Sequence, residues 1–365
     1  MKKVVFITNI LRQPRCIRRI KDFISRGYDI KVYGFDRQDD NRALPNFDYQ
    51  CIGVNSNSES YVSRLFKMRN SISAIINREG IDCTYYIFSL DVAIASLAAK
   101  RKIKFCYEIS DLMELQVKNK LISSILVRLN RWIISQSVLN VYTSEGFVDY
   151  LSPKGACSDR TVVLPNKLNR EISKLKDFNR KSIDINNIRF GFTGAIRTET
   201  IYNFIDAVGQ LGKHEVHLYG IFTDEGNGRY SIKSLVDKYS NVFYHGVFKN
   251  PDDFPEIYSN FDLVLCYYYS SKNDIYLEPN KLYEAIYFRC PIVVSDGTFV
   301  GKKVSETNIG YVIPAKCKNS LVDFIDSINE TTYYEKLEAL NIIPKENALD
   351  DSKPLFKMMD SILKK

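Results

Sequence analysis

The sequence lacks several features that mark particular classes of protein. None of its 365 residues belongs to an apolar run near the ~20 residues that a membrane-spanning helix needs. The eight cysteines include no Cys-x-x-Cys pair, and His214, His217 and His245, the three histidines, have no supporting ligands nearby. Met1-Lys2-Lys3 leads into a short apolar run without a cleavage pattern. We therefore expect a cytoplasmic chain with reduced thiols and no bound metal.

Motifs for nucleotide cofactors and nucleic acids are also missing. The first apolar run, residues 4–8, is not followed by Gly-x-Gly-x-x-Gly, which speaks against a dinucleotide-dependent dehydrogenase. The turn instead reads Asn9-Ile10-Leu11-Arg12-Gln13-Pro14-Arg15, so Asn9 or Arg15 is a candidate for contact with a polar substrate. No nucleic-acid-binding motif is recognisable, and nucleic acid is not an expected partner.

The charge is unevenly distributed. The formal net charge is +8, but residues 1–170 carry 27 Lys and Arg against 16 Asp and Glu, whereas residues 171–365 carry 24 against 27. This asymmetry suggests that the first half meets an anionic partner, such as membrane phosphate or a lipid-linked molecule. The alternative is a basic surface that is only solvated.

Alternating strand and helix patterns run through both halves. In the first half, strands are predicted at residues 4–8, 30–35, 83–88, 104–109 and 138–143, and helices at 16–26, 61–78, 93–100 and 121–136. The alternation restarts at residues 188–194, with further strands at 216–220, 241–246, 263–265 and 292–295. The pattern predicts two α/β domains, each with a parallel sheet covered on both faces.

One α-to-β step carries the clearest chemistry. Pro279 stands where a helix can begin, so the helix should start near Asn280. Its first turn offers unpaired N–H groups to an anion, and Glu284, one turn in, can accept hydrogen bonds from sugar hydroxyls. A diphosphate and a ribose together describe a nucleotide. The alternative is a capped surface helix with an ordinary exposed glutamate.

The run Pro279-Asn280-Lys281-Leu282-Tyr283-Glu284 resembles the nucleotide-sugar binding segment of GT-B glycosyltransferases, in the broad group of glycosyltransferase family 4. The resemblance implies that Glu284 binds the ribose. The family commonly has a second glutamate eight positions earlier, where this chain has Tyr276, while Glu278 lies six positions earlier. Which of these two takes the place of the family's first glutamate stays open.

Further landmarks of that family occur in order between residues 188 and 313. The resemblance implies a donor site that uses Gly194, Gly220, Asn280, Leu282 and Glu284. It implies leaving-group stabilisation by Arg197, with Glu278 and Lys281 as further catalytic residues. The chain has no Asp-x-Asp, the pattern with which many other glycosyltransferases hold a divalent ion, so neither a metal nor another cofactor is expected.

The first half resembles the acceptor domain of the same enzymes. Asn9, Arg15 and Asp111 are the predicted acceptor contacts, although Asp111 fits a helix N-cap equally well. The stretch 121–136 combines a broad apolar face with Arg128, Arg131 and the single tryptophan. It could lie on an anionic membrane or pack on its own sheet.

The expected architecture is two Rossmann-like domains that face across a cleft, as in the GT-B fold. The boundaries expected are an acceptor domain at 1–168, a linker at 169–187, a donor domain at 188–347 and a C-terminal helix at 348–365. By the resemblance, that last helix crosses back onto the first domain; the alternative is that it ends its own domain.

The expected activity is glycosyl transfer. A sugar would pass from a nucleoside-diphosphate sugar to a lipid-linked or growing bacterial polysaccharide, with retention of configuration and without metal, on the inner face of the cell membrane. Two alternatives stay open: a nucleotide-sugar 2-epimerase on the same scaffold, and a non-catalytic basic binding protein.

Overall fold

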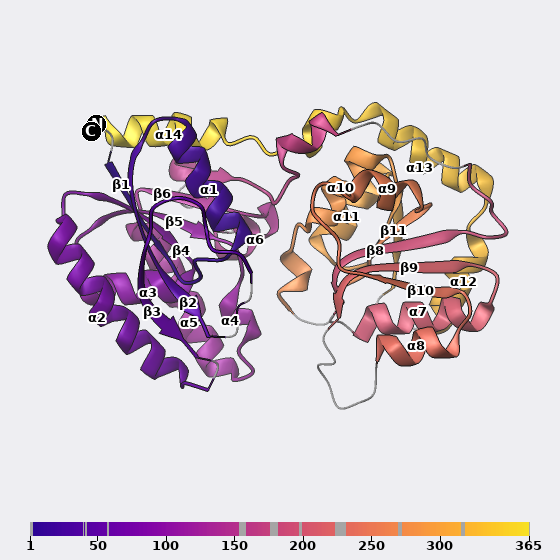
Figure 1. The fold of residues 1–365 in the computed structure, drawn as a ribbon, viewed down its shortest axis with the longest axis horizontal. Helices are drawn as coiled ribbons and strands as arrows, with labels where there is room; N and C mark the ends of the chain where they lie inside the picture. Colours follow the sequence, from indigo (N-terminus) through magenta and orange to yellow (C-terminus); the bar gives the residue numbers. More distant parts are fainter. Residues whose placement is uncertain are drawn as a thin grey trace. The chain divides into compact units, whose positions relative to one another are not determined.

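Two compact units make up the chain. The computed structural model describes residues 3–38, 40, 42–56, 58–152, 158–175, 182–196, 199–222, 231–268, 272–314 and 318–364. Residues 1–164 together with 351–365 form the first unit, and residues 165–350 form the second. Each unit is an α/β structure built on a parallel sheet (Figure 1).

The sheet of the first unit is wound in both directions from its first strand. Its strands are β1 (Lys3–Thr8), β2 (Asp29–Arg37), β3 (Gln50–Asn55), β4 (Thr84–Phe88), β5 (Lys104–Ile109), β6 (Leu139–Tyr142) and β7 (Thr161–Val163). They lie in the order β3-β2-β1-β4-β5-β6-β7, and Val4 of β1 pairs with Ile30 on one side and Thr84 on the other. The strand order reverses between β1 and β4, and such a reversal opens a crevice at the carboxyl ends of the strands.

Helices join these strands. They are α1 (Pro14–Ser25), α2 (Tyr61–Glu79), α3 (Leu90–Ala99), α4 (Met113–Gln116), α5 (Lys120–Gln136) and α6 (Glu145–Leu151), with a 3₁₀ turn η1 (Ser158–Arg160). Helix α1 illustrates the local logic: Pro14 occupies its first turn, while Cys16, Ile20 and Phe23 recur at helical spacing and are buried. Gly27 then adopts φ 73°, which ends the helix where the sequence predicted.

The last helix, α14 (Lys353–Leu363), completes the core of the first unit. Leu355, Phe356 and Met359 are buried in the same cluster as Phe6 and Phe23. The rings of Phe356 and Phe23 have centroids 4.8 Å apart, and the hydroxyl of Tyr28 donates to Asp360 at 2.6 Å. The return of the chain's end to the first half, predicted from the family resemblance, is therefore confirmed.

The second unit repeats the winding with its own strands. These are β8 (Arg189–Ile196), β9 (Glu215–Phe222), β10 (Val242–Gly246), β11 (Leu263–Cys266), β12 (Ile292–Ser295) and β13 (Gly310–Ile313). Their order is β10-β9-β8-β11-β12-β13, so the direction of winding reverses between β8 and β11.

Helices cover both faces of this second sheet. They are α7 (Glu199–Leu211), α8 (Ile232–Lys238), α9 (Phe254–Ser259), α10 (Asn280–Phe288), α11 (Phe299–Thr307), α12 (Lys318–Ser327) and α13 (Glu330–Ile342), with 3₁₀ turns η2 (Arg170–Lys174), η3 (Asp274–Tyr276) and η4 (Lys345–Ala348). Strand β11 shows why both faces need cover: Leu263 and Leu265 join a cluster with α7 and α12, whereas Val264 and Cys266 join another with α9 and α10.

The division between the units falls earlier than the predicted linker. Residues 165–175, placed at the end of the acceptor domain and in the linker by sequence, belong to the second unit. Leu168 and Ile172 are buried in its core, the N–H of Leu168 donates to Ala348 at 2.9 Å, and the N–H of Asp350 donates to Leu168 at 2.8 Å. These bonds join the start of the unit to its end. Residues 176–181 of the predicted linker lie outside the described residues.

Truncating Phe356 tests how far the first unit depends on α14. We expect Phe356→Ala to lower the free energy of unfolding of the first unit by about 3–5 kcal/mol, because a buried ring is lost from a packed core. Trp132, the only tryptophan in the sequence, lies in this unit, so its fluorescence during urea unfolding reports this unit alone. The exposed neighbour Lys357→Ala should change stability by less than about 0.5 kcal/mol. Equal effects of the two changes would contradict the packing role.

Candidate active site

The predicted donor residues lie near the point where the strand order of the second sheet reverses. Strand β8 ends beside β9 on one side and β11 on the other, and Thr193 and Gly194 lie near its carboxyl end. Ligands of parallel α/β sheets bind at such reversals, because neighbouring connections leave the sheet on opposite faces there.

Two glycines remove side chains from this edge. Gly194 and Gly220 are paired in register on β8 and β9, with φ of 112° and 132°. A Cβ on Gly220 would overlap the backbone carbonyl of Gly194, so only glycine fits there. The need for glycine at 220 thus comes from the neighbouring strand, and the approach of backbone to a ligand at Gly194 and Gly220 stays a prediction.

Helix α10 starts at Asn280, as the position of Pro279 predicted. Pro279 is its N-cap residue, with extended φ and ψ of −77° and 153°, and its carbonyl accepts from the N–H of Leu282 at 3.1 Å. The first N–H groups of a helix lack intrahelical partners and carry partial positive charge, which makes this end suitable for an anion.

Glu284 joins three elements of the unit. The carboxylate, on α10, is 5% exposed, and its Oε2 accepts from the Thr193 hydroxyl on β8 at 3.1 Å and from the Tyr258 hydroxyl on α9. Burial, and then the negative charge of Glu284, raise the pKa of Tyr258 well above its ordinary value, so the phenol stays a donor. The carboxylate of Glu284, which is predicted to bind the ribose, is thus fixed by two hydrogen bonds near the end of β8.

Lys281 places a positive charge beside Gly194. Its ammonium lies 4.3 Å from the centroid of the Phe192 ring and 3.5 Å from the position that a Cβ on Gly194 would take. Burial lowers the pKa of Lys281, but the neighbouring Tyr268 and Glu284 outweigh it, so the pKa lies above its ordinary value. The lysine therefore stays charged although it is only 8% exposed.

Glu278 is a buried carboxylate with one oxygen unsatisfied. Its Oε1 accepts from Lys303 Nζ at 2.8 Å and from the Tyr283 hydroxyl. Its Oε2 is buried, and the part of the chain that the structure describes offers it no hydrogen-bond partner. Such an atom is costly unless a ligand hydroxyl or water supplies a donor. Tyr276, the residue at the family's position, lies in η3.

Two other predicted residues do not add a described side chain to this site. The side chain of Leu282 packs in the core with Phe288 and Val294 at 3% exposure, so only its backbone is left for a donor contact, and its assignment stays a prediction. Arg197, predicted to stabilise the leaving group, lies outside the described residues.

Sequence reasoning missed the side chains that hold the carboxylates. Thr193 and Tyr258 anchor Glu284, while Tyr283 and Lys303 anchor Glu278. A signal existed for Thr193, which stands next to Gly194 at a strand end. Nothing in the sequence pairs Lys303 with Glu278, because their contact depends on how α11 packs.

A pocket of about 220 Å³ lies at the corresponding edge of the first unit. Asn9 after β1, Ser89 after β4 and Asp111 after β5 line it, so the structure brings two of the three predicted acceptor contacts together. Asn9 Oδ1 is buried and has no partner among the described residues. Arg15 is not part of the pocket lining: its Nε lies 3.5 Å from Glu108 Oε1, an ion pair inside the unit.

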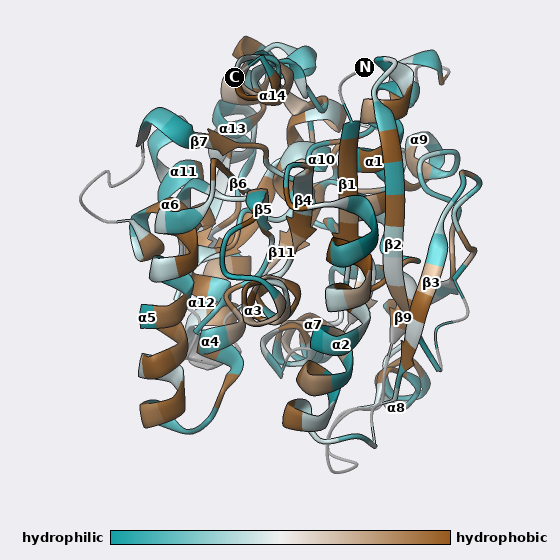
Figure 2. Ribbon diagram, turned by 90° about the vertical axis from the view of Figure 1, so that its left-hand side faces the viewer, coloured by the Kyte–Doolittle hydropathy of each residue, from teal (hydrophilic) through white to brown (hydrophobic). Residues whose placement is uncertain are grey.

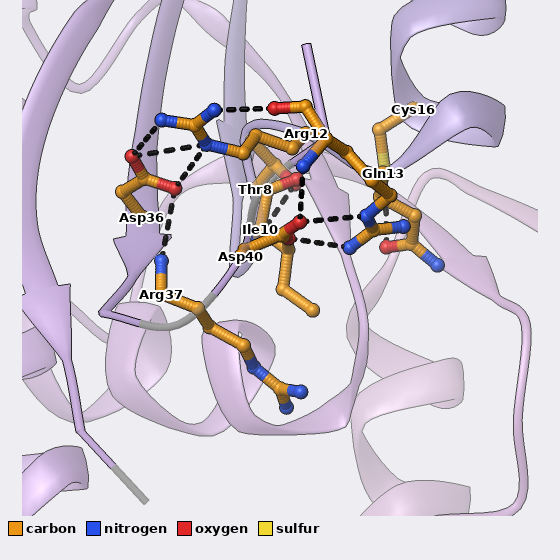
Figure 3. A network of polar contacts seen from close by, with 9 residues as sticks. Thr8, Ile10, Arg12, Gln13, Cys16, Asp36, Arg37 and Asp40 are labelled. Atoms are coloured by element: carbon orange, nitrogen blue, oxygen red, sulfur yellow. Dashed lines mark hydrogen bonds and ion pairs between the residues drawn. The ribbon is translucent and has the colours of Figure 1, made fainter. Parts of the chain in front are cut away.

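An arginine that was not predicted fixes the turn that carries Asn9. Arg12 donates from Nε and Nη2 to the carboxylate of Asp36 at 2.9 and 3.0 Å, and from Nη1 to the Arg42 carbonyl (Figure 3). Arg42 in turn binds Asp40. The guanidinium of Arg37 points away from this network in Figure 3 and lines the pocket.

The described residues contain no cluster of metal ligands. Within the described ranges, no group of three or more His, Cys, Asp or Glu side chains could hold a metal ion. His217 instead shares a hydrogen bond with His245 at 3.0 Å and contacts Glu215 at 2.9 Å.

Known proteins resemble this chain in sequence. Residues 174–342 match the model of the family "Glycosyl transferases group 1". The chain is 20% identical over 369 residues to the succinoglycan biosynthesis protein ExoL of Rhizobium meliloti, covering 93% of this chain and 88% of that protein.

Solved structures share the fold over the whole chain. Sucrose-phosphate synthase from Thermosynechococcus elongatus superposes with a TM-score of 0.70 at 14% identity, covering 99% of this chain and 98% of that one. Anabaena HepE in complex with UDP-glucose superposes with a TM-score of 0.67 at 14% identity, covering all of both chains. The predicted GT-B fold is thereby confirmed.

The glycine pair at the sheet edge gives a testable stability difference. Gly220→Ala should lower the free energy of unfolding by roughly 1 kcal/mol for its positive φ and by roughly 1–3 kcal/mol more for the clash with Gly194. Gly212→Ala is the matched control, since its φ is 70° but a Cβ there would meet open space. Calorimetry of the two variants measures the difference. Equal destabilisation would mean that the strands separate freely at this edge.

Proposed function

We infer that this GT-B glycosyltransferase moves a glycosyl group from a nucleoside-diphosphate sugar to an acceptor bound by the first unit. The observation that carries the inference is the meeting of Lys281, the start of α10 and the buried Glu284 beside the bare backbone of Gly194. Lys281 and the start of α10 suit the negative charge of a diphosphate, and the fixed carboxylate of Glu284 suits the hydroxyls of a ribose. HepE, which has the same fold, is known in complex with UDP-glucose.

The positively charged groups act on the diphosphate, and the carboxylates bind sugar hydroxyls. The chemical barrier is the departure of a diphosphate, on which negative charge develops. Lys281 and the N-terminus of α10 offset that charge, together with Arg197, at about 3–4 kcal/mol for each well-placed donor. Because Thr193 and Tyr258 occupy Oε2 of Glu284, the ribose hydroxyls bind at Oε1. Glu278 Oε2 accepts a hydrogen bond from a hydroxyl of the transferred sugar, which gives this buried oxygen a partner.

The acceptor binds in the pocket of the first unit. Asn9 and Asp111 present an amide and a carboxylate there, which suit the hydroxyls of a glycan. The likeness to a succinoglycan biosynthesis protein favours a growing or lipid-linked polysaccharide as that glycan. We further propose that transfer retains the anomeric configuration and needs no metal, with the departing phosphate deprotonating the acceptor.

Exchanging Glu284 tests the donor site. We expect one of UDP, GDP and CDP, or the corresponding nucleotide sugar, to raise the melting temperature in the presence of EDTA. Glu284→Gln should weaken the binding of that ligand by roughly ten- to a hundredfold. The exposed Glu306→Gln, whose carboxylate pairs with Lys302 at the surface, should bind like the parent chain. No response to any of these nucleotides would remove the donor site and favour a non-catalytic binding protein.

Exchanging Lys281 tests the catalytic charge. Lys281→Met keeps the aliphatic stem against Phe192 and Tyr268 but removes the ammonium, so kcat should fall by about 10²- to 10³-fold. Lys302→Met, on a lysine that is 71% exposed, should leave kcat unchanged. The readout is nucleotide release that depends on an added glycan acceptor. Release without an acceptor, together with epimerised sugar, would identify a 2-epimerase instead.

A further inference from the structure

Helix α5 of the first unit carries apolar side chains on the face that points away from its own core. Leu121, Ile125 and Trp132 are 71%, 52% and 41% exposed. With Arg128 they recur at positions i, i+4, i+7 and i+11, which places them in one stripe along the helix. The opposite face holds the buried Asn130, Ile133 and Ile134. The helix therefore has a second apolar face, which does not pack on its own sheet.

The charges on and before α5 are all positive. The helix contains no Asp or Glu, Arg128 and Arg131 lie on its exposed side, and Lys118 and Lys120 stand at its start. The helix is firmly begun, because the Asn119 side chain accepts from the N–H groups of Leu121 and Ile122. Basic residues that flank an exposed apolar stripe are the features of a helix that lies in the surface of an anionic bilayer.

Helix α2 extends this surface. Val62 and Phe66, four residues apart on one side of α2, are 74% and 65% exposed. Helix α3 contacts both α2 and α5. Figure 2 shows hydrophobic bands on α2 and on α5. Both helices begin after carboxyl ends of strands, so these first turns lie at the same edge of the sheet.

We propose that the first unit docks on an anionic phospholipid bilayer through the outer stripe of α5, with the first turns of α2 as a second contact. A bilayer with anionic headgroups fits this surface, because α5 and the two residues before it carry positive charges and no acidic one. Trp132 and the arginines have apolar bodies with polar ends, which suit the boundary between lipid headgroups and acyl chains. Among the residues that the structure describes, none of the helices could cross a bilayer.

Docking would bring the pocket of the first unit to the lipid surface. Tyr61, Arg64 and Leu65 of α2 line that pocket, as do Met113 and Gln116 of α4, which packs against α5. A glycan attached to a lipid carrier could then enter the pocket while its carrier stays in the bilayer. This consequence rests on the proposed glycosyl transfer, whereas the docking itself does not.

Co-sedimentation with vesicles tests the docking. The full chain should bind vesicles of phosphatidylcholine and phosphatidylglycerol in equal parts, and bind pure phosphatidylcholine much less. The double variant Leu121→Gln/Ile125→Gln should partition roughly tenfold more weakly, because partitioning follows buried apolar area. Both residues are exposed, so the variant should keep the parent's melting temperature. Ile342→Gln, at an 82% exposed position of the second unit, is the matched control and should bind like the parent.

Three outcomes would overturn the proposal. They are equal binding by the double variant, no binding to the mixed vesicles, and a dimer in sedimentation analysis that the double variant separates, which would make the stripe a contact between copies of this chain. Nucleotide binding measured without vesicles distinguishes the two hypotheses. If donor binding persists while docking fails, only the docking is wrong, whereas docking without donor binding would refute the proposed transfer.

Discussion

The pairing of β8 with β11 is the constraint on which the second unit depends. Gly191 has no room for a side chain, because the ring of Phe261 occupies the place of its Cβ. Asp262, fully buried, binds the Arg189 guanidinium with both oxygens at 2.9 and 2.7 Å and accepts from the Arg189 N–H at 2.8 Å. Loss of either partner would leave an uncompensated charge. Because β8 and β11 pair here, the strand order of the second sheet reverses at this place, where ligands of parallel α/β sheets bind.

The two carboxylates of the candidate site are held by side chains from other elements. Glu284 accepts from Thr193 and Tyr258, and Glu278 accepts from Lys303. Charges fixed before the substrate arrives need no reorganisation when charge develops on a leaving group, which is why such sites act more strongly than water does. Among the described residues, Glu278 Oε2 has no hydrogen-bond partner, so it can still accept from a ligand.

The chain passes between the units twice, and the second passage adds a helix to the core of the first unit. The crossings fall at residues 164–165 and 350–351, and Leu168 is bonded to Ala348 and Asp350 just beyond them. The second passage delivers α14, whose Phe356 fills the first core. The first unit therefore folds around both ends of the sequence, while its α2 and α5 leave apolar side chains exposed on the other face of the sheet.

The sequence by itself determined the two α/β halves and the start of α10, and it predicted the place of the candidate donor site. These follow from local rules: the periodicity of buried residues, the fixed φ of Pro279 and the glycines at strand ends. Only the tertiary structure decided which neighbours these side chains meet. Arg15 lies beside Glu108, Leu282 packs in the core, and Glu278 accepts from Lys303. Such partners are distant along the chain, so they depend on packing between elements, which no local pattern records.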